Sequence, residues 1–144
     1  MTPSASPRPH HDIELRVRYG ETDQMGVVYH AEYLVWCEMG RTEYIRALGL
    51  PYAEIERRGI RLAVAEATLR YHAPARYDEM IRVETSILRV GSRAIEFEYH
   101  VRSGHSGARL ATARTTLVAM DRDGRATTIP PDIREPFQRA CQAR

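Results

Sequence analysis

The segment from His30 to Leu48 constrains the fold most, because it carries the longest helical pattern of the chain. Its apolar residues recur at intervals of three and four, as they do on one face of an amphipathic helix. They are Tyr33, Trp36, Cys37, Gly40, Tyr44, Ile45 and Leu48. Gly49 and Pro51 predict where this helix ends. Gly40 costs about 1 kcal/mol relative to alanine in mid-helix, so we expect the helix backbone to lie close against another surface there.

Segments of alternating polar and apolar residues make up most of the remaining chain, and such alternation is typical of half-buried strands. The elements predicted in this way are strands over 13–19, 61–73, 80–90, 93–102 and 110–120, a short strand to Ile129 after the hairpin turn Asp123-Gly124, and short helices over 52–58 and 132–140. Ala63, Ala65 and Ala67 stand at alternate positions of one strand. We expect these small side chains to leave room for the long helix on the concave face of the sheet.

The predicted order of one strand, a long helix and then four or five antiparallel strands describes an α+β fold in one domain, residues 13–144. Residues 1–12 are rich in proline, serine and histidine and are predicted to form a disordered lead-in, without the apolar region of a signal peptide. One helix cannot cover both faces of such a sheet, and its edge strands need protection. We therefore expect a homo-oligomer.

Composition narrows the function classes. The net charge is only +2, and no basic patch with interleaved aromatic residues is present, which argues against nucleic-acid binding. No apolar run approaches the roughly 18 residues of a membrane span, so we expect a cytoplasmic protein without one. Cys37 and Cys141 follow no metal or redox spacing, and we expect no metal site. Cys37 lies on the apolar helix face and is interpreted as a buried structural thiol.

The loop between Tyr19 and His30 is the most informative part of the chain for function. It joins a predicted strand to the start of the long helix, where free backbone N–H groups and the positive end of the helix dipole are available. A carboxylate, Asp23, lies in this loop. An acid beside such donors is what acyl transfer needs. An aspartate before a helix is also an ordinary capping residue, and the spacing alone leaves both roles open.

Three segments carry a resemblance to a known family. They are Tyr19-Gly20-Glu21-Thr22-Asp23 with Gly26-Val27-Val28-Tyr29-His30, the helix segment Arg41-Thr42-Glu43, and Tyr71-His72-Ala73-Pro74-Ala75-Arg76-Tyr77-Asp78-Glu79. With them the chain resembles the hotdog-fold thioesterases, in particular 4-hydroxybenzoyl-CoA thioesterase and the small bacterial acyl-CoA thioesterases. The resemblance covers about residues 13 to 140. It implies a five- or six-stranded antiparallel sheet wrapped around one long helix, in dimers that often associate into tetramers.

The resemblance also implies site residues. Asp23 matches the family's catalytic acid, as nucleophile or general base. His30 matches the oxyanion donor through its backbone N–H, and its side chain and Tyr19 match further catalytic positions. The substrate-binding residues predicted are Gly26, Val28 and Tyr29 in the loop, and Arg89, Ser92 and Arg93 for the coenzyme A arm of a neighbouring subunit.

The predicted function is hydrolysis of an acyl-CoA thioester to free acid and coenzyme A, with no cofactor beyond the coenzyme A of the substrate. The alternative is a non-catalytic hotdog protein that binds acyl-CoA or an acyl carrier, because a fold does not fix a function. A hydratase of this fold is disfavoured, since its pattern of a histidine and an aspartate is not found here. The acyl group, whether aromatic, short or medium in length, stays open.

Overall fold

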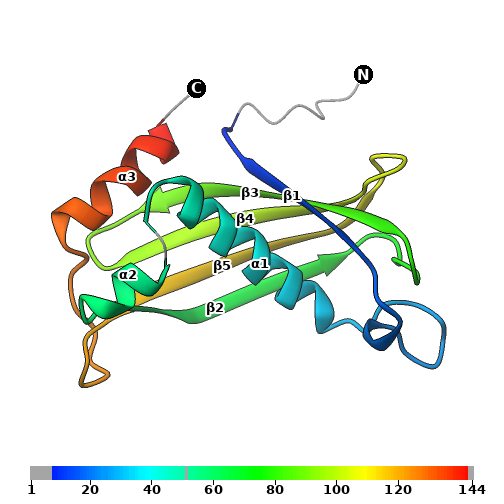
Figure 1. The fold of residues 1–144 in the computed structure, drawn as a ribbon, viewed down its shortest axis with the longest axis horizontal. Coiled ribbons are helices and arrows are strands. Elements are labelled where there is room, and N and C mark those ends of the chain that lie inside the picture. Colours follow the sequence, from blue (N-terminus) through cyan, green and yellow to red (C-terminus); the bar gives the residue numbers. More distant parts are fainter. Residues whose placement is uncertain (1–7, 51, 143–144) are drawn as a thin grey trace.

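The computed structural model describes residues 8–50 and 52–142. Its elements, in chain order, are β1 (His11–Arg16), η1 (Tyr19–Glu21, a 3₁₀ turn), α1 (Glu32–Ala47), α2 (Tyr52–Arg57), β2 (Arg61–Tyr71), β3 (Met80–Val90), β4 (Ala94–Ser103), β5 (Arg109–Met120) and α3 (Pro131–Gln142). The strands form one antiparallel sheet in the order β1-β3-β4-β5-β2, and α1 crosses one of its faces (Figure 1). The predicted α+β fold and antiparallel sheet are confirmed.

Helix α1 packs its apolar face on the inner face of the sheet, chiefly over β1 and β3. Trp36, Cys37 and Ile45 on that face are completely buried. Gly40 lies where the helix comes nearest to β3: a Cβ at this position would stand 2.6 Å from Thr85 Oγ1 and 3.1 Å from Val83 Cγ1. The close approach expected at Gly40 is therefore confirmed.

Strand β4 shows most clearly that the two faces of the sheet differ. Its inward residues Ile95, Phe97, Tyr99 and Val101 are buried, and the polar residues between them face outward. Helix α3 packs on β3 and adds Ile133 and Phe137 to the same core. The prediction of a sheet wrapped around one long helix was thus incomplete, because α3 contributes to the core as well.

Strand β1 begins earlier than predicted. It covers His11–Arg16 rather than 13–19, and the ring of His11 stacks on Tyr44 with centroids 5.6 Å apart. His11 and Asp12, assigned to the lead-in, therefore belong to the sheet, whereas residues 1–7 of that segment lie outside the described residues. The chain leaves the sheet after Arg16 and turns into η1, so Tyr19 begins a 3₁₀ turn instead of ending a strand.

The expectation for the alanines of β2 was wrong. A bulge between Val64 and Glu66 makes Ala65 an extra residue, so Ala63 and Ala67 point to opposite faces of the sheet. Helix α1 lies over β1 and β3 rather than over this strand. Strand β2 instead forms an edge of the sheet, with residues 63–68 exposed on both faces. Such an edge presents unpaired backbone groups to a neighbour.

Two further predictions concern the hairpin turn after β5 and a membrane-spanning helix. The Asp123-Gly124 turn is confirmed, but the strand after it reduces to a single bridge between Met120 and Ala126. Across residues 8–50 and 52–142, no helix is long and apolar enough to cross a bilayer.

Candidate active site

The loop that carries Asp23 is fastened at both ends. Thr22 and Val28 form an antiparallel bridge, and the Asp23 N–H donates to Val27 O at 2.8 Å. The segment after β2 holds the loop from the side, because the Val28 N–H donates to Ala75 O at 2.9 Å. The loop is therefore a tight hairpin, and these backbone hydrogen bonds hold Asp23 in place.

The Asp23 side chain has the geometry of a turn cap. Its Oδ1 accepts hydrogen bonds from the N–H groups of Met25, at 2.9 Å, and Val27, at 3.4 Å. Gly26 completes the turn with a φ of 80°, in the left-handed region that favours glycine. Oδ2 has no hydrogen-bond partner within the described residues. One oxygen of the half-buried carboxylate thus holds the turn, and the other is available to a ligand.

Glu21 anchors this loop to α1. The side chain is 5% exposed, and it accepts the Arg18 backbone N–H at 2.8 Å and the Trp36 indole N–H at 3.2 Å. The Glu21 carbonyl accepts the Tyr29 N–H at 2.9 Å. No role was predicted for Glu21 from the sequence. A glutamate among apolar contacts needs such partners, but its contact with Trp36, fifteen residues away, is not visible in the pattern.

His30 lies in the turn before α1, because the helix begins at Glu32 and not at His30. Its carbonyl accepts the Tyr71 hydroxyl at 2.8 Å, and its ring lies beside Tyr29, with centroids 4.4 Å apart. In the part of the chain that the structure describes, its backbone N–H has no acceptor. This N–H is available to a ligand, as an oxyanion donor must be.

An apolar hollow of about 320 Å³ opens beside His30. Its lining residues are Val27, Val28, His30, Tyr33, Tyr71, His72, Ala73 and Pro74. Of the predicted site residues, only Val28 and His30 are among them, and Asp23 is not. Three of the lining residues, Tyr33, Tyr71 and His72, were given no site role from the sequence. Tyr71 and His72 belong to the sequence motif that carries the family resemblance, and this was the one signal in the sequence that they could lie at the site.

Tyrosines at this hollow stay protonated near neutral pH. Burial raises the pKa of Tyr33, whose hydroxyl oxygen accepts the Ala75 N–H at 3.2 Å. Burial also raises the pKa of Tyr71, which meets the Tyr33 ring edge to face at a centroid distance of 5.2 Å. Both side chains therefore act as neutral hydrogen-bonding and packing groups.

The remaining predicted residues lie elsewhere. The Tyr19 ring is 77% exposed and meets the edge of Tyr77 rather than the hollow. Arg89 lies near the end of β3, and Ser92 and Arg93 lie in the turn between β3 and β4. This turn is at the opposite end of the sheet from the Asp23 loop (Figure 1). In one chain they cannot reach a substrate held at Asp23. Their predicted contact with the coenzyme A arm would have to come from a neighbouring subunit.

Two other kinds of site were considered, a metal site and a nucleophilic thiol. Among the described residues, no three His, Cys, Asp or Glu side chains come together in a way that could hold a metal ion. Burial raises the pKa of Cys37 to about 12, so the thiol is protonated and is not a nucleophile.

Comparisons with known proteins agree with one another. The profile of the thioesterase-like superfamily matches residues 17–137. The putative acyl-CoA thioesterase YneP of Bacillus subtilis is 43% identical over 88 residues, which is 61% of this chain and 64% of that protein. The acyl-acyl carrier protein thioesterase ATL2 of Arabidopsis thaliana is 35% identical over 88% of this chain and 68% of its own. The chain thus matches about two thirds of the length of these relatives.

Solved structures lead to the same family. A hypothetical protein of Thermus thermophilus, TT1821, aligns with a TM-score of 0.84 and 38% identity over 88% of this chain and 96% of its own. The DHNA-CoA thioesterase of Staphylococcus aureus aligns with a TM-score of 0.86 and 29% identity over 90% and 89% of the two chains. The match over residues 17–137 confirms the resemblance to the thioesterases, and the chain belongs to the thioesterase-like superfamily.

Proposed function

We propose that this protein is an acyl-CoA thioesterase that hydrolyses its substrate to free acid and coenzyme A. The observation that carries the proposal is the pair of uncommitted groups at the two ends of one tight loop: Asp23 Oδ2 and the His30 N–H. An apolar hollow adjoins the second of them. A carboxylate, a backbone donor and an apolar cavity are the parts that hydrolysis of an acyl thioester requires.

Two routes use these groups. In the first, the Asp23 carboxylate attacks the thioester carbonyl carbon, the carbon–sulfur bond breaks, coenzyme A leaves as thiolate, and water then hydrolyses the mixed anhydride. In the second, Asp23 accepts a proton from a water that attacks the same carbon, and the carbon–sulfur bond of the resulting tetrahedral intermediate then breaks, which releases the acid and coenzyme A. In both, the His30 N–H donates to the developing oxyanion. A thiolate is a good leaving group, so neither route needs a strong general acid.

A second subunit would complete this site. Val64 on the edge strand β2 is 51% exposed, and Met25 and Tyr19 near the Asp23 loop are 79% and 77% exposed. An edge strand with unpaired backbone groups is a template for pairing with another chain. We propose a homodimer in which β2 pairs with its counterpart, covering the edge and bringing partner residues toward Asp23. Dimers of this kind could pair further into the tetramers that the family resemblance implies.

The hydrogen bonds by which Asp23 caps its turn favour one alternative function. A carboxylate that only holds the turn would leave a protein that binds acyl-CoA or an acyl carrier without hydrolysing it. The relative ATL2, named as an acyl-acyl carrier protein thioesterase, also makes the acyl carrier protein a candidate substrate.

The test is a thiol-release assay of the purified protein with aromatic, short-chain and medium-chain acyl-CoAs and with the same acyl groups on an acyl carrier protein. Turnover of acyl-CoA supports the proposal, and the best substrate identifies the acyl group. Tight binding of every thioester without thiol release would overturn it in favour of the binding protein.

A further inference from the structure

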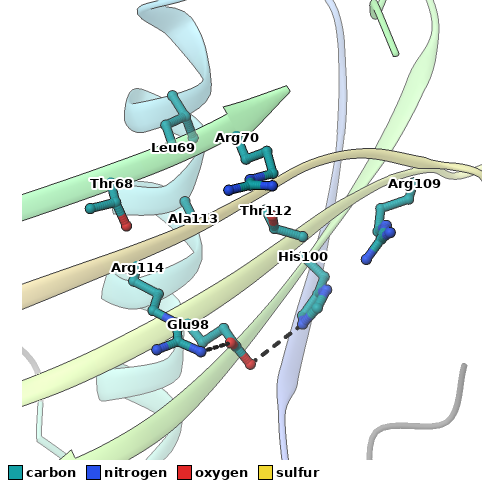
Figure 2. A pocket seen from close by; sticks show the side chains of 9 residues that line it. All are labelled: Thr68, Leu69, Arg70, Glu98, His100, Arg109, Thr112, Ala113 and Arg114. Carbon is teal, nitrogen blue, oxygen red and sulfur yellow. Dashed lines mark ion pairs between the residues drawn. The ribbon is translucent and has the colours of Figure 1, made fainter. Parts of the chain in front are cut away.

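A second cavity, of about 440 Å³, lies on the opposite face of the sheet from α1 (Figure 2). It spans β2, β5 and β4, and its lining residues are Thr68, Leu69, Arg70, Glu98, His100, Arg109, Thr112, Ala113 and Arg114. We call it the outer groove. Its volume is in the range of small-molecule sites, roughly 300–1,000 Å³. No step of the proposed hydrolysis uses it.

The strand register explains why polar groups gather there. Arg70 of β2 pairs with Thr112 of β5, which in turn pairs with His100 of β4. The neighbouring row consists of Thr68, Arg114 and Glu98. Side chains at paired positions point to the same face of a sheet. The two rows therefore place two guanidinium groups, an imidazole, two hydroxyls and one carboxylate side by side.

The groove carries an excess of positive charge. Its one carboxylate, Glu98, lies 3.2 Å from Arg114 and 3.5 Å from His100 (Figure 2). Within the described residues, Arg70 and Arg109 have no carboxylate at ion-pair distance. Three arginines against one glutamate leave a formal charge of +2 in the lining, as large as the net charge of the whole chain. An anionic ligand would be attracted to this face.

His72 connects the outer groove with the apolar hollow. His72 is a lining residue of the hollow, and its ring Nε2 hydrogen-bonds Thr112 Oγ1, a groove residue, at 3.1 Å. Desolvation lowers the pKa of His72, and the charges of Arg109 and Arg70 lower it further. A single residue, His72, thus links the hollow to the groove.

We propose that the outer groove binds a phosphate-bearing small molecule, with Arg70 and Arg109 as its principal ligands. A guanidinium presents its N–H groups in a planar fork that fits two oxygens of a phosphate. The hydroxyl of Thr68 supplies a further donor, and the hydroxyl of Thr112 supplies another when His72 Nε2–H donates to its oxygen. The phosphate has two possible sources: the coenzyme A end of the substrate, which would rest on the proposed function, or a separate phosphorylated metabolite, which would not.

Calorimetry with inorganic pyrophosphate and with coenzyme A tests the proposal. The double variant Arg70→Gln/Arg109→Gln is compared with Arg46→Gln/Arg139→Gln, which removes the same charge from exposed arginines outside the groove. We expect the wild type and the control to bind pyrophosphate and the groove variant to bind it about tenfold or more weakly. No binding by the folded wild type, or equal loss in both double variants, would overturn the proposal.

Steady-state kinetics then distinguish the two possible sources of the bound phosphate. The KM is measured for an acyl-CoA and for the same acyl group on N-acetylcysteamine, which carries no phosphate. A higher KM of the groove variant for acyl-CoA alone assigns the groove to the coenzyme A end. Unchanged KM values, with pyrophosphate binding lost, assign it to a separate ligand. If the wild type hydrolyses neither thioester, the proposed function fails, whereas the pyrophosphate measurement still decides the groove.

Discussion

The indole N–H of Trp36 donates a hydrogen bond to the buried carboxylate of Glu21 at 3.2 Å. This contact joins the core of α1 to the start of the loop that carries Asp23. Because the Glu21 carbonyl also accepts the Tyr29 N–H, one residue holds both ends of the loop. The proposed site therefore depends on a side chain that would touch no substrate.

Replacement of Glu21 is expected to lower stability. In Glu21→Ala, the Trp36 N–H and the Arg18 N–H lose their acceptor, and a buried unsatisfied donor costs about 1–3 kcal/mol. Glu21→Gln keeps one acceptor oxygen and should lose less. Urea unfolding measures both free energies. An alanine variant as stable as the wild type would show that the anchor does not hold the loop.

Gly40→Ala is expected to destabilise the protein, although helix propensity alone favours alanine by about 1 kcal/mol. The new methyl group would stand 2.6 Å from Thr85 Oγ1, and overpacking of this kind costs about 1–3 kcal/mol. Thr85 Oγ1 is buried and has no partner in the described part of the chain, so Thr85→Ala removes an unsatisfied hydroxyl and makes room. The double variant should recover stability, as a double-mutant cycle by thermal unfolding would measure. A more stable Gly40→Ala single variant would contradict the close contact.

Arg109→Gln is expected to raise the pKa of His72. Desolvation is the largest cause of its lowered pKa and stays in the variant, but the repulsion from Arg109 is removed. A lowered pKa means that the unfolded chain binds more protons, so His72 reduces the unfolding free energy as the pH falls below about 6.5. NMR titration of the His72 ring gives the pKa, with Arg46→Gln as control. An unchanged pKa would show that the field of the groove does not reach His72.

Val64→Arg is expected to disrupt the proposed dimer, because it places a charge where the partner's edge strand would pack. Sedimentation should give at least twice the chain mass for the wild type and a lower mass, without pairing through β2, for the variant. Ala126→Arg adds the same charge at another exposed position and should leave the dimer intact. A monomeric wild type would refute pairing through β2.

Local patterns predicted much of the fold. The alternation of β4 predicted its buried face, and Gly40 predicted the close approach of α1, because both follow from the period of a single element. The bulge at Ala65 was not predictable in the same way. Most side chains around Ala65 are small on both faces of the strand, so their sizes do not reveal where the strand register shifts.

The candidate site was predictable only where its contacts are local. The hydrogen bonds of the Asp23 cap span two and four residues, and a capping role was one of the two predicted for this aspartate. The hydrogen bond from Tyr71 to His30 spans 41 residues and depends on how β2 lies beside the start of α1. The placement of Arg89 at the far end of the sheet likewise follows from topology, which no single motif contains.

The most direct test of the proposed catalytic role of Asp23 compares Asp23→Asn with Asp23→Ala. Asparagine keeps an oxygen that can accept the Met25 and Val27 N–H groups, so the turn is preserved while the carboxylate is lost. We predict that Asp23→Asn unfolds at the wild-type temperature but releases thiol from acyl-CoA about 100-fold or more slowly. An asparagine variant with near-wild-type turnover, beside an inactive and unstable alanine variant, would show that Asp23 only caps its turn.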